Sequence, residues 1–206
     1  MIATRYLYLA RHGEALPDES GLTDRGRRQA ELLGDRLRDI PFTAVHHGPL
    51  PRAAQTAQLI ASRLTAAPTP SAAEPAGDYP PYLPAEGDLP AEHAAVVTRV
   101  LEHYGSQELA RGPELAREAL ARFTGPVAGG RDSYELLVTH NFLIGWLVRH
   151  AMDAPPWRWA GLNHGNAALT VIRYAPGRLA SVLTYNDAGH LPEDLRWTGL
   201  PPELHP

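Results

Sequence analysis

Three short segments of the sequence combine histidine and arginine side chains in a way that suits chemistry on a phosphate group. The first is Arg11-His12-Gly13-Glu14. A histidine side chain has a reference pKa of about 6.5, so a neutral imidazole is available near neutral pH and can attack phosphorus. The neighbouring guanidinium can bind two phosphate oxygens at once. Gly13 allows the backbone to approach a ligand closely.

The other two segments contain Arg52 and His140. Arg52 falls in the first turn of a helix that is predicted to begin at Pro51, and the free N–H groups of such a turn favour an anion. A cation there opposes the helix dipole unless an anion lies nearby. His140 follows a predicted strand, where a protonated imidazole can bind phosphate oxygens. Taken singly, these residues also fit a solvated arginine and a buried structural histidine.

The amino-acid composition limits the classes of protein to which this chain can belong. The 206 residues are 44% hydrophobic and 20% charged, which fits one domain over residues 1–206. The formal net charge is −4 and no lysine- or arginine-rich run occurs, so we expect no nucleic-acid partner. The absence of cysteine excludes disulfides and cysteine nucleophiles. No apolar run approaches the ~20 residues of a membrane span and no signal peptide is recognisable, so we expect no membrane contact and a cytoplasmic location.

Predicted strands and helices alternate along the chain. The expected strands are 6–10, 42–46, 69–72, 134–139, 168–174 and 179–185, and the expected helices are 24–39, 51–65, 91–103, 113–123 and 142–152. This alternation predicts an α/β fold with a mostly parallel central sheet flanked by helices. A proline-rich stretch and two helices form a predicted loop and small helical insertion at about residues 74–130. The tail after Leu191 is predicted to be irregular.

The predicted topology brings the three segments together. In a parallel sheet, ligands bind beyond the carboxyl ends of the strands. Arg11-His12, residues 48–52 and His140 each follow a predicted strand. We therefore expect their side chains to converge at one edge of the sheet.

With a fourth segment, this set resembles the histidine phosphatase superfamily, which has the phosphoglycerate-mutase-like fold. The matches run through most of the chain in the family's order: Arg11-His12-Gly13-Glu14; Leu22-Thr23-Asp24-Arg25-Gly26 leading to Gln29-Ala30; Pro49-Leu50 with Arg52-Ala53 and Thr56-Ala57; and Thr139-His140. The resemblance implies that His12 accepts the phosphoryl group and that water then removes it. It also implies a pocket of Arg11, Arg52 and His140 around His12, with no metal or other cofactor.

The sequence departs from the family pattern at several positions. Gly48 stands where serine is common. Asp18 stands where many members have asparagine, and a carboxylate there would oppose phosphate unless it is turned away or paired. The general acid, usually a glutamate after the second helix, has four candidates: Glu74, Asp78, Glu86 and Asp88. We expect Asp78, because its spacing from Arg52 is similar to that in family members.

These features predict a histidine acid-type phosphatase, a metal-independent phosphomonoester hydrolase that forms a phosphohistidine on His12. Its substrate is either a phosphorylated small molecule or a phosphoprotein. One alternative is a phosphoglycerate-mutase-type phosphotransferase, although the chain is short for that class and lacks its later segments. A non-catalytic phosphate-binding module is a second alternative, because the acid is not obvious. A metallohydrolase is the third, although Arg11 beside His12 would repel a metal cation.

Overall fold

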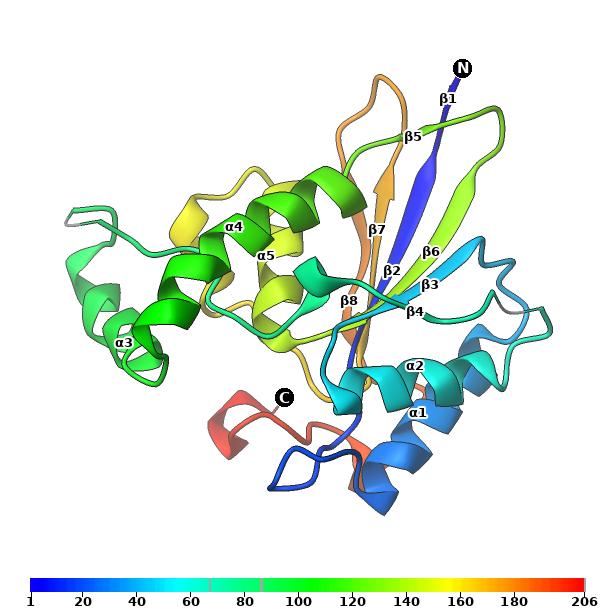
Figure 1. Cartoon of the computed structure of the whole chain (residues 1–206), viewed down its shortest axis with the longest axis horizontal. Coiled ribbons are helices and arrows are strands. Elements are labelled where there is room, and N and C mark those ends of the chain that lie inside the picture. The colour runs from blue at the N-terminus through cyan, green and yellow to red at the C-terminus, as the bar shows by residue number, and fades with distance from the viewer. Residues whose placement is uncertain (67, 86, 206) are drawn as a thin grey trace.

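A six-stranded sheet forms the centre of the computed structural model, which describes residues 1–66, 68–85 and 87–205 (Figure 1). Its strand order is β4-β3-β6-β2-β7-β8. The strands are β2 (Arg5–Arg11), β3 (Ala44–His47), β4 (Ser71–Ala72), β6 (Ser133–Thr139), β7 (Leu169–Tyr174) and β8 (Ser181–Asp187). The first four strands in that order pair in parallel, whereas β7 and β8 are antiparallel. The prediction of a mostly parallel sheet is therefore confirmed.

Helices cover both faces of this sheet (Figure 1). The helices α1 (Asp24–Leu37) and α2 (Pro51–Ala61) pack on one face, and α4 (Ser106–Phe123) and α5 (Asn141–Ala151) pack on the other. The helix α3 (Ala91–Leu101) lies beyond α4, away from the sheet (Figure 1). Short 3-10 turns are η1 (Glu74–Ala76), η2 (Pro156–Trp159), η3 (Glu193–Leu195) and η4 (Pro202–Leu204), and a separate antiparallel pair joins β1 (Ile2–Ala3) to β5 (Val127–Ala128).

Alternation along β6 shows why the sheet needs two helical layers. Leu136 and Val138 belong to the core under α1 and α2, whereas Leu137 belongs to the core under α4 and α5. All three are fully buried. A strand that is covered on both faces reads as a continuous apolar run, and this property made β6 recognisable in the sequence.

Local signals fix the start of each of the two helices nearest the site. Thr23 Oγ1 accepts a hydrogen bond from Gly26 N at 3.0 Å and thereby caps α1. Pro51 occupies the first turn of α2, where its missing N–H costs nothing. The loop after β2 packs closely on α1, because a Cβ on Gly13 would lie 2.4 Å from Gly26 O.

Two predicted helix boundaries are wrong by more than two residues. The helix expected at 51–65 ends at Ala61, and Thr65 N instead donates to Arg38 O at 3.0 Å, which ties this segment to the end of α1. The helix expected at 113–123 begins at Ser106, with Pro113 in its interior. Glu108 Oε2 accepts from Gly105 N at 2.9 Å and starts the helix there. No described helix combines the length and the apolar character needed to cross a membrane.

Candidate active site

The three predicted segments converge at the carboxyl ends of neighbouring parallel strands. Arg11 ends β2 and His12 follows it, His140 lies between β6 and α5, and Arg52 lies in the first turn of α2 after β3. His12 N donates to Thr139 O at 3.0 Å, so the ends of β2 and β6 stay in register. The rings of His12 and His140 are 5.1 Å apart between centroids. The predicted convergence is confirmed.

The imidazole of His12 presents one ring nitrogen with a free lone pair. Its Nδ1 lies 2.7 Å from Gly13 O. Because a carbonyl oxygen only accepts, Nδ1 carries the proton and Nε2 is unprotonated. Burial lowers the pKa of His12 well below its ordinary value, and the neighbouring His140 and Arg11 lower it further. His12 is therefore a neutral ring with Nε2 available as a nucleophile.

Two guanidinium groups supply positive charge beside this ring. Arg11 Nη1 donates to His164 O at 2.6 Å and to Gly199 O at 2.8 Å, and neutral carbonyls leave its charge uncompensated. Burial lowers the pKa of Arg11 to about 10, so it remains a cation at neutral pH. Arg52 is only 4% exposed, and its Nη2 donates to Asp78 Oδ2 at 2.8 Å.

Several buried polar atoms in this site have no hydrogen-bond partner among the described residues. They are Arg11 Nε, Arg52 Nη1, and both ring nitrogens of His140. Buried polar groups are nearly always hydrogen-bonded, so such a cluster marks a place that is built to bind a polar ligand. Burial and the two arginines lower the pKa of His140 well below its ordinary value. The lining is thus cationic through its arginines, which suits an anion.

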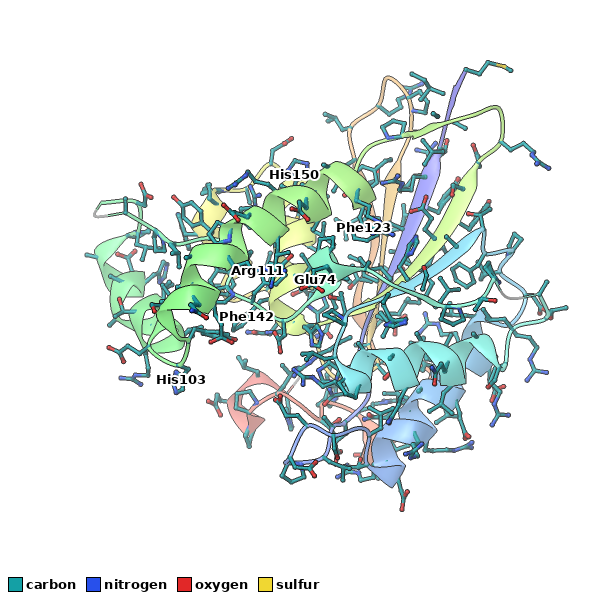
Figure 2. The ribbon with its side chains drawn as sticks, in the orientation of Figure 1. Glu74, His103, Arg111, Phe123, Phe142 and His150 are labelled. Carbon is teal, nitrogen blue, oxygen red and sulfur yellow. The ribbon has the colours of Figure 1, made fainter. Side chains whose placement is uncertain are left out.

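Among the described acid candidates, only Asp78 reaches the site. Its Oδ2 lies 2.8 Å from Arg52 Nη2 and 3.5 Å from His140 Nδ1. Glu74 instead pairs with Arg111 of α4 at 2.9 Å (Figure 2). Asp88 accepts from Tyr82 Oη and Ala85 N. Glu86 lies outside the described residues.

The structure gives a physical reason for each departure from the family pattern. A Cβ on Gly48 would lie 2.4 Å from Ala76 O, so glycine allows η1 to pack against the end of β3. Asp18 Oδ1 accepts from Ser20 N at 3.1 Å and from Ser20 Oγ at 2.7 Å, so this carboxylate is paired locally. In the described part of the chain, no hydrogen bond or ion pair joins Asp18 to Arg11, Arg52 or His140.

Residues of the C-terminal half that were not predicted for the site support its backbone. Asn166 Nδ2 donates to His12 O at 2.9 Å, and Asn166 Oδ1 accepts from Thr198 Oγ1 at 3.1 Å. Gly199 contributes a carbonyl to Arg11, and with φ +76° a Cβ there would lie 2.3 Å from Asn166 Oδ1. The sequence feature that could have predicted this contribution is Gly199 after Thr198 in the irregular tail, since glycine often marks a place where the backbone approaches another group closely.

The buried His164 predicts a pH-dependent stability. Burial, and then Arg11, lower its pKa to about 3, against about 6.5 in the unfolded chain. Between these values the unfolded state binds more protons, so the free energy of unfolding falls as pH falls, by up to ~1.4 kcal/mol per pH unit. We expect His164→Gln to have a shallower loss of stability than the parent between pH 7 and pH 5 in urea unfolding. Replacing the exposed His103 is the control. If His164→Gln and the parent lose stability equally as pH falls, the lowered pKa of His164 is not the cause.

Solved structures with this fold include enzymes of two kinds. The chain superposes on phosphoglycerate mutase from Plasmodium falciparum with a TM-score of 0.58 and 19% identity, covering 93% of this chain and 96% of that one. It superposes on the alpha-ribazole phosphatase from Shigella flexneri with a TM-score of 0.60 and 22% identity, covering 88% and 96%. The phosphoglycerate-mutase-like fold that the resemblance implies is confirmed.

A relative in sequence is the serine/threonine-protein phosphatase Pgam5, mitochondrial, of Caenorhabditis briggsae. The two are 33% identical over 193 residues, which is 92% of this chain and 65% of the relative. The chain thus spans slightly less than two thirds of that protein. The expectation of a cytoplasmic location is wrong by this comparison, because this relative and its mouse and human counterparts are all named mitochondrial.

The pattern of residues also matches a family model over most of the chain. The model describes the histidine phosphatase superfamily, branch 1, and it matches residues 7–188. That range includes Arg11 and His12 at the end of β2, the start of α2 with Arg52, and His140 after β6. The chain therefore belongs to branch 1 of the histidine phosphatase superfamily.

Proposed function

We propose that this chain is a phosphomonoester hydrolase in which His12 Nε2 is transiently phosphorylated. The observation that carries the proposal is the group of buried polar atoms on Arg11, Arg52 and His140 that have no hydrogen-bond partner among the described residues, beside the neutral ring of His12. Phosphoryl transfer depends mainly on positioning and on stabilising the charge of the phosphate oxygens. This pocket supplies two fixed cations, a nucleophile and a carboxyl group.

The first step forms a bond between phosphorus and His12 Nε2 and breaks the ester P–O bond. The lone pair on Nε2 makes the new bond, and the leaving oxygen takes the electron pair of the old one. Asp78, when protonated, gives its proton to that oxygen. During this step Nδ1–H of His12 donates to Gly13 O and stabilises the positive charge that forms on the ring.

The second step is hydrolysis of the phosphohistidine. Asp78, now a carboxylate, accepts a proton from water as its oxygen bonds to phosphorus, and the P–N bond breaks to restore the neutral ring. The lowered pKa of His12 keeps the free nucleophile unprotonated in mildly acidic solution. This property supports an acid-type phosphatase.

We propose a phosphoprotein as the first substrate class to test. The relative from Caenorhabditis briggsae is named a serine/threonine-protein phosphatase, which favours this class. A phosphorylated small molecule is the second class, favoured by the likeness to an alpha-ribazole phosphatase. Water as the acceptor distinguishes both from a mutase.

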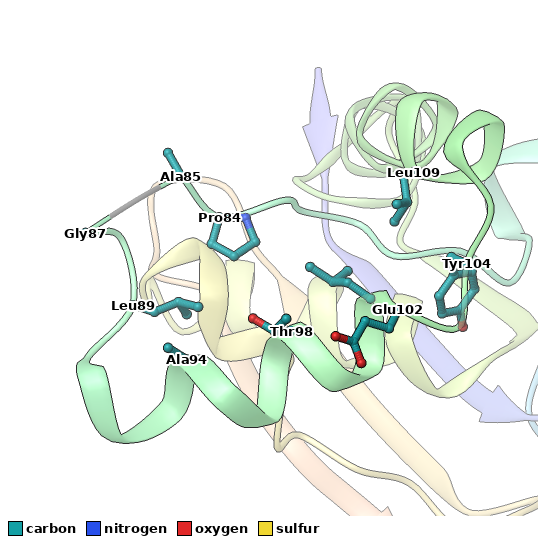
Figure 3. A pocket seen from close by; sticks show the side chains of 10 residues that line it. Pro84, Ala85, Gly87, Leu89, Ala94, Thr98, Glu102, Tyr104 and Leu109 are labelled. Atoms are coloured by element: carbon teal, nitrogen blue, oxygen red, sulfur yellow. The ribbon is translucent and has the colours of Figure 1, made fainter.

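We propose a single domain over residues 1–206 whose insertion at 74–130 forms a substrate cleft. Between the proline-rich segment and α3 lies a cleft of about 550 Å³ that includes Pro84, Leu89, Thr98, Glu102 and Tyr104 (Figure 3). Burial raises the pKa of Tyr104, and the nearby Asp78 carboxylate raises it further. Tyr104 therefore lies where this cleft approaches the candidate acid.

The test is a hydrolysis assay in excess EDTA with p-nitrophenyl phosphate, a phosphoserine peptide and 3-phosphoglycerate. We expect phosphate release from the first two, inhibition by vanadate as a mimic of five-coordinate phosphorus, and no conversion of 3-phosphoglycerate to its 2-isomer. Activity that is lost in EDTA and restored by a divalent metal would favour the metallohydrolase. Tight phosphate binding without turnover would favour the binding module.

A further inference from the structure

Arg52 contacts a second carboxylate that the proposed reaction does not use. Its Nη2 donates to Asp78, the candidate acid, while its Nη1 lies 3.1 Å from Glu19 Oε2. The arginine side chain is 5% exposed, and that of Glu19 is 66% exposed. A surface carboxylate thus reaches inward to a buried cation of the phosphate pocket.

The loop that carries Glu19 is held in a defined shape. Leu16 N donates to Gly21 O at 3.0 Å, and Glu19 N donates to Leu16 O at 2.9 Å. Asp18 bonds to Ser20 on the other side of Glu19. Glu19 has φ 59°, in the left-handed region that residues with a Cβ seldom adopt. The local bonds therefore place the Glu19 side chain over the site despite an unfavourable backbone conformation.

The contact between Glu19 and Arg52 is an ion pair without a well-aligned hydrogen bond. Arg52 Nη1 has no hydrogen-bond partner within the described part of the chain, although Glu19 Oε2 is at contact distance. This nitrogen is thus one of the buried polar atoms that face the proposed phosphate site. A doubly charged phosphate with aligned oxygens is a better partner for it than a single solvated carboxylate.

We propose that the Glu19 carboxylate occupies the place of a phosphate oxygen at Arg52 Nη1. The substrate's phosphate displaces this carboxylate when it binds. Glu19 thereby sets the affinity of the site for phosphate. This inference rests on the proposed function of the same pocket. It makes Glu19 an affinity-determining residue outside the reaction itself. Competition by Glu19 also favours release of the inorganic phosphate product.

The test is direct binding of inorganic phosphate measured by isothermal titration calorimetry. Glu19→Gln keeps the shape of the side chain but removes its charge, so phosphate should bind up to about fivefold more tightly, as expected when a competing exposed ion pair is lost. The difference should shrink between roughly 0.02 M and 0.5 M salt, because salt screens the exposed carboxylate. Glu19→Gly removes the charge and also relieves the backbone strain, and it should bind like Glu19→Gln.

The control is Glu114→Gln, an exposed carboxylate on α4 for which no ion pair is found within the described residues, and it should leave phosphate affinity unchanged. Equal or weaker phosphate binding in Glu19→Gln, with normal binding in the parent, would overturn the role of Glu19 and leave the phosphate site intact. If Glu19→Gly binds phosphate more tightly than the parent while Glu19→Gln binds it equally, the effect comes from the backbone. That result would also overturn the role of the Glu19 carboxylate. A parent that binds neither phosphate nor vanadate would refute the proposed function itself.

Discussion

Replacing His12 with alanine will reduce the kcat for p-nitrophenyl phosphate at least ~10³-fold while the protein remains folded. The substitution removes Nε2, which holds the lone pair in the only neutral tautomer compatible with the bond from Nδ1 to Gly13 O. Arg11, Arg52 and His140 remain to bind phosphate, so the loss should appear mainly in kcat. Phosphate affinity measured separately should survive.

A trapping experiment distinguishes a nucleophile from a residue that only binds. Brief reaction of the parent with labelled substrate, quenched in alkali, should leave acid-labile phosphate on His12, and the alanine variant should carry none. His150→Ala is the matched control, because His150 is a partly buried histidine at the far end of α5 (Figure 2). Retained turnover in His12→Ala, with unchanged thermal unfolding, would end the assignment.

Asp78→Asn will impair hydrolysis of an alkyl phosphate ~10²–10⁴-fold more than hydrolysis of p-nitrophenyl phosphate. An alkoxide needs a proton as it leaves, whereas a nitrophenolate is stable without one. The amide keeps the size of the carboxyl group beside Arg52 and His140 but has no acidic proton to give. Comparing two leaving groups on one variant cancels any change in how the pocket binds phosphate.

Two other carboxylates provide controls for this comparison. Glu74→Gln breaks the ion pair with Arg111, and Asp88→Asn breaks the contact with Tyr82, and neither carboxylate pairs with Arg52 or His140 in the described part of the chain. Neither variant should show a dependence on the leaving group. If one of them does and Asp78→Asn does not, the assigned acid is wrong although the phosphatase proposal stands. If all three behave alike, the proton comes from another group or the natural leaving group needs none.

The fold and the centre of the site could be predicted because both depend on patterns that are local in the sequence. Apolar runs such as Leu136 to Val138 mark strands that are covered on both faces, and Pro51 and Thr23 mark helix starts. Arg11 is the last residue of such a strand, and His12 and His140 each directly follow one. A parallel sheet brings the carboxyl ends of its strands to one edge, so the position of each residue along the chain was enough to bring them together.

Contacts that depend on the path of irregular segments could be identified only from the tertiary structure. The two carbonyls that hold Arg11 come from His164 and Gly199, which are 153 and 188 residues away in the sequence. The spacing from Arg52 already favoured Asp78 in the sequence, but the contacts of Asp78 and Glu19 with Arg52 depend on the paths of two loops. Hydrophobic periodicity in the sequence shows which face of a helix or strand is buried. It carries no information on which residues an exposed loop side chain contacts. The sequence by itself therefore determined that Arg11, His12, Arg52 and His140 meet at one edge of the sheet, and the tertiary structure decided which carboxylates lie against Arg52.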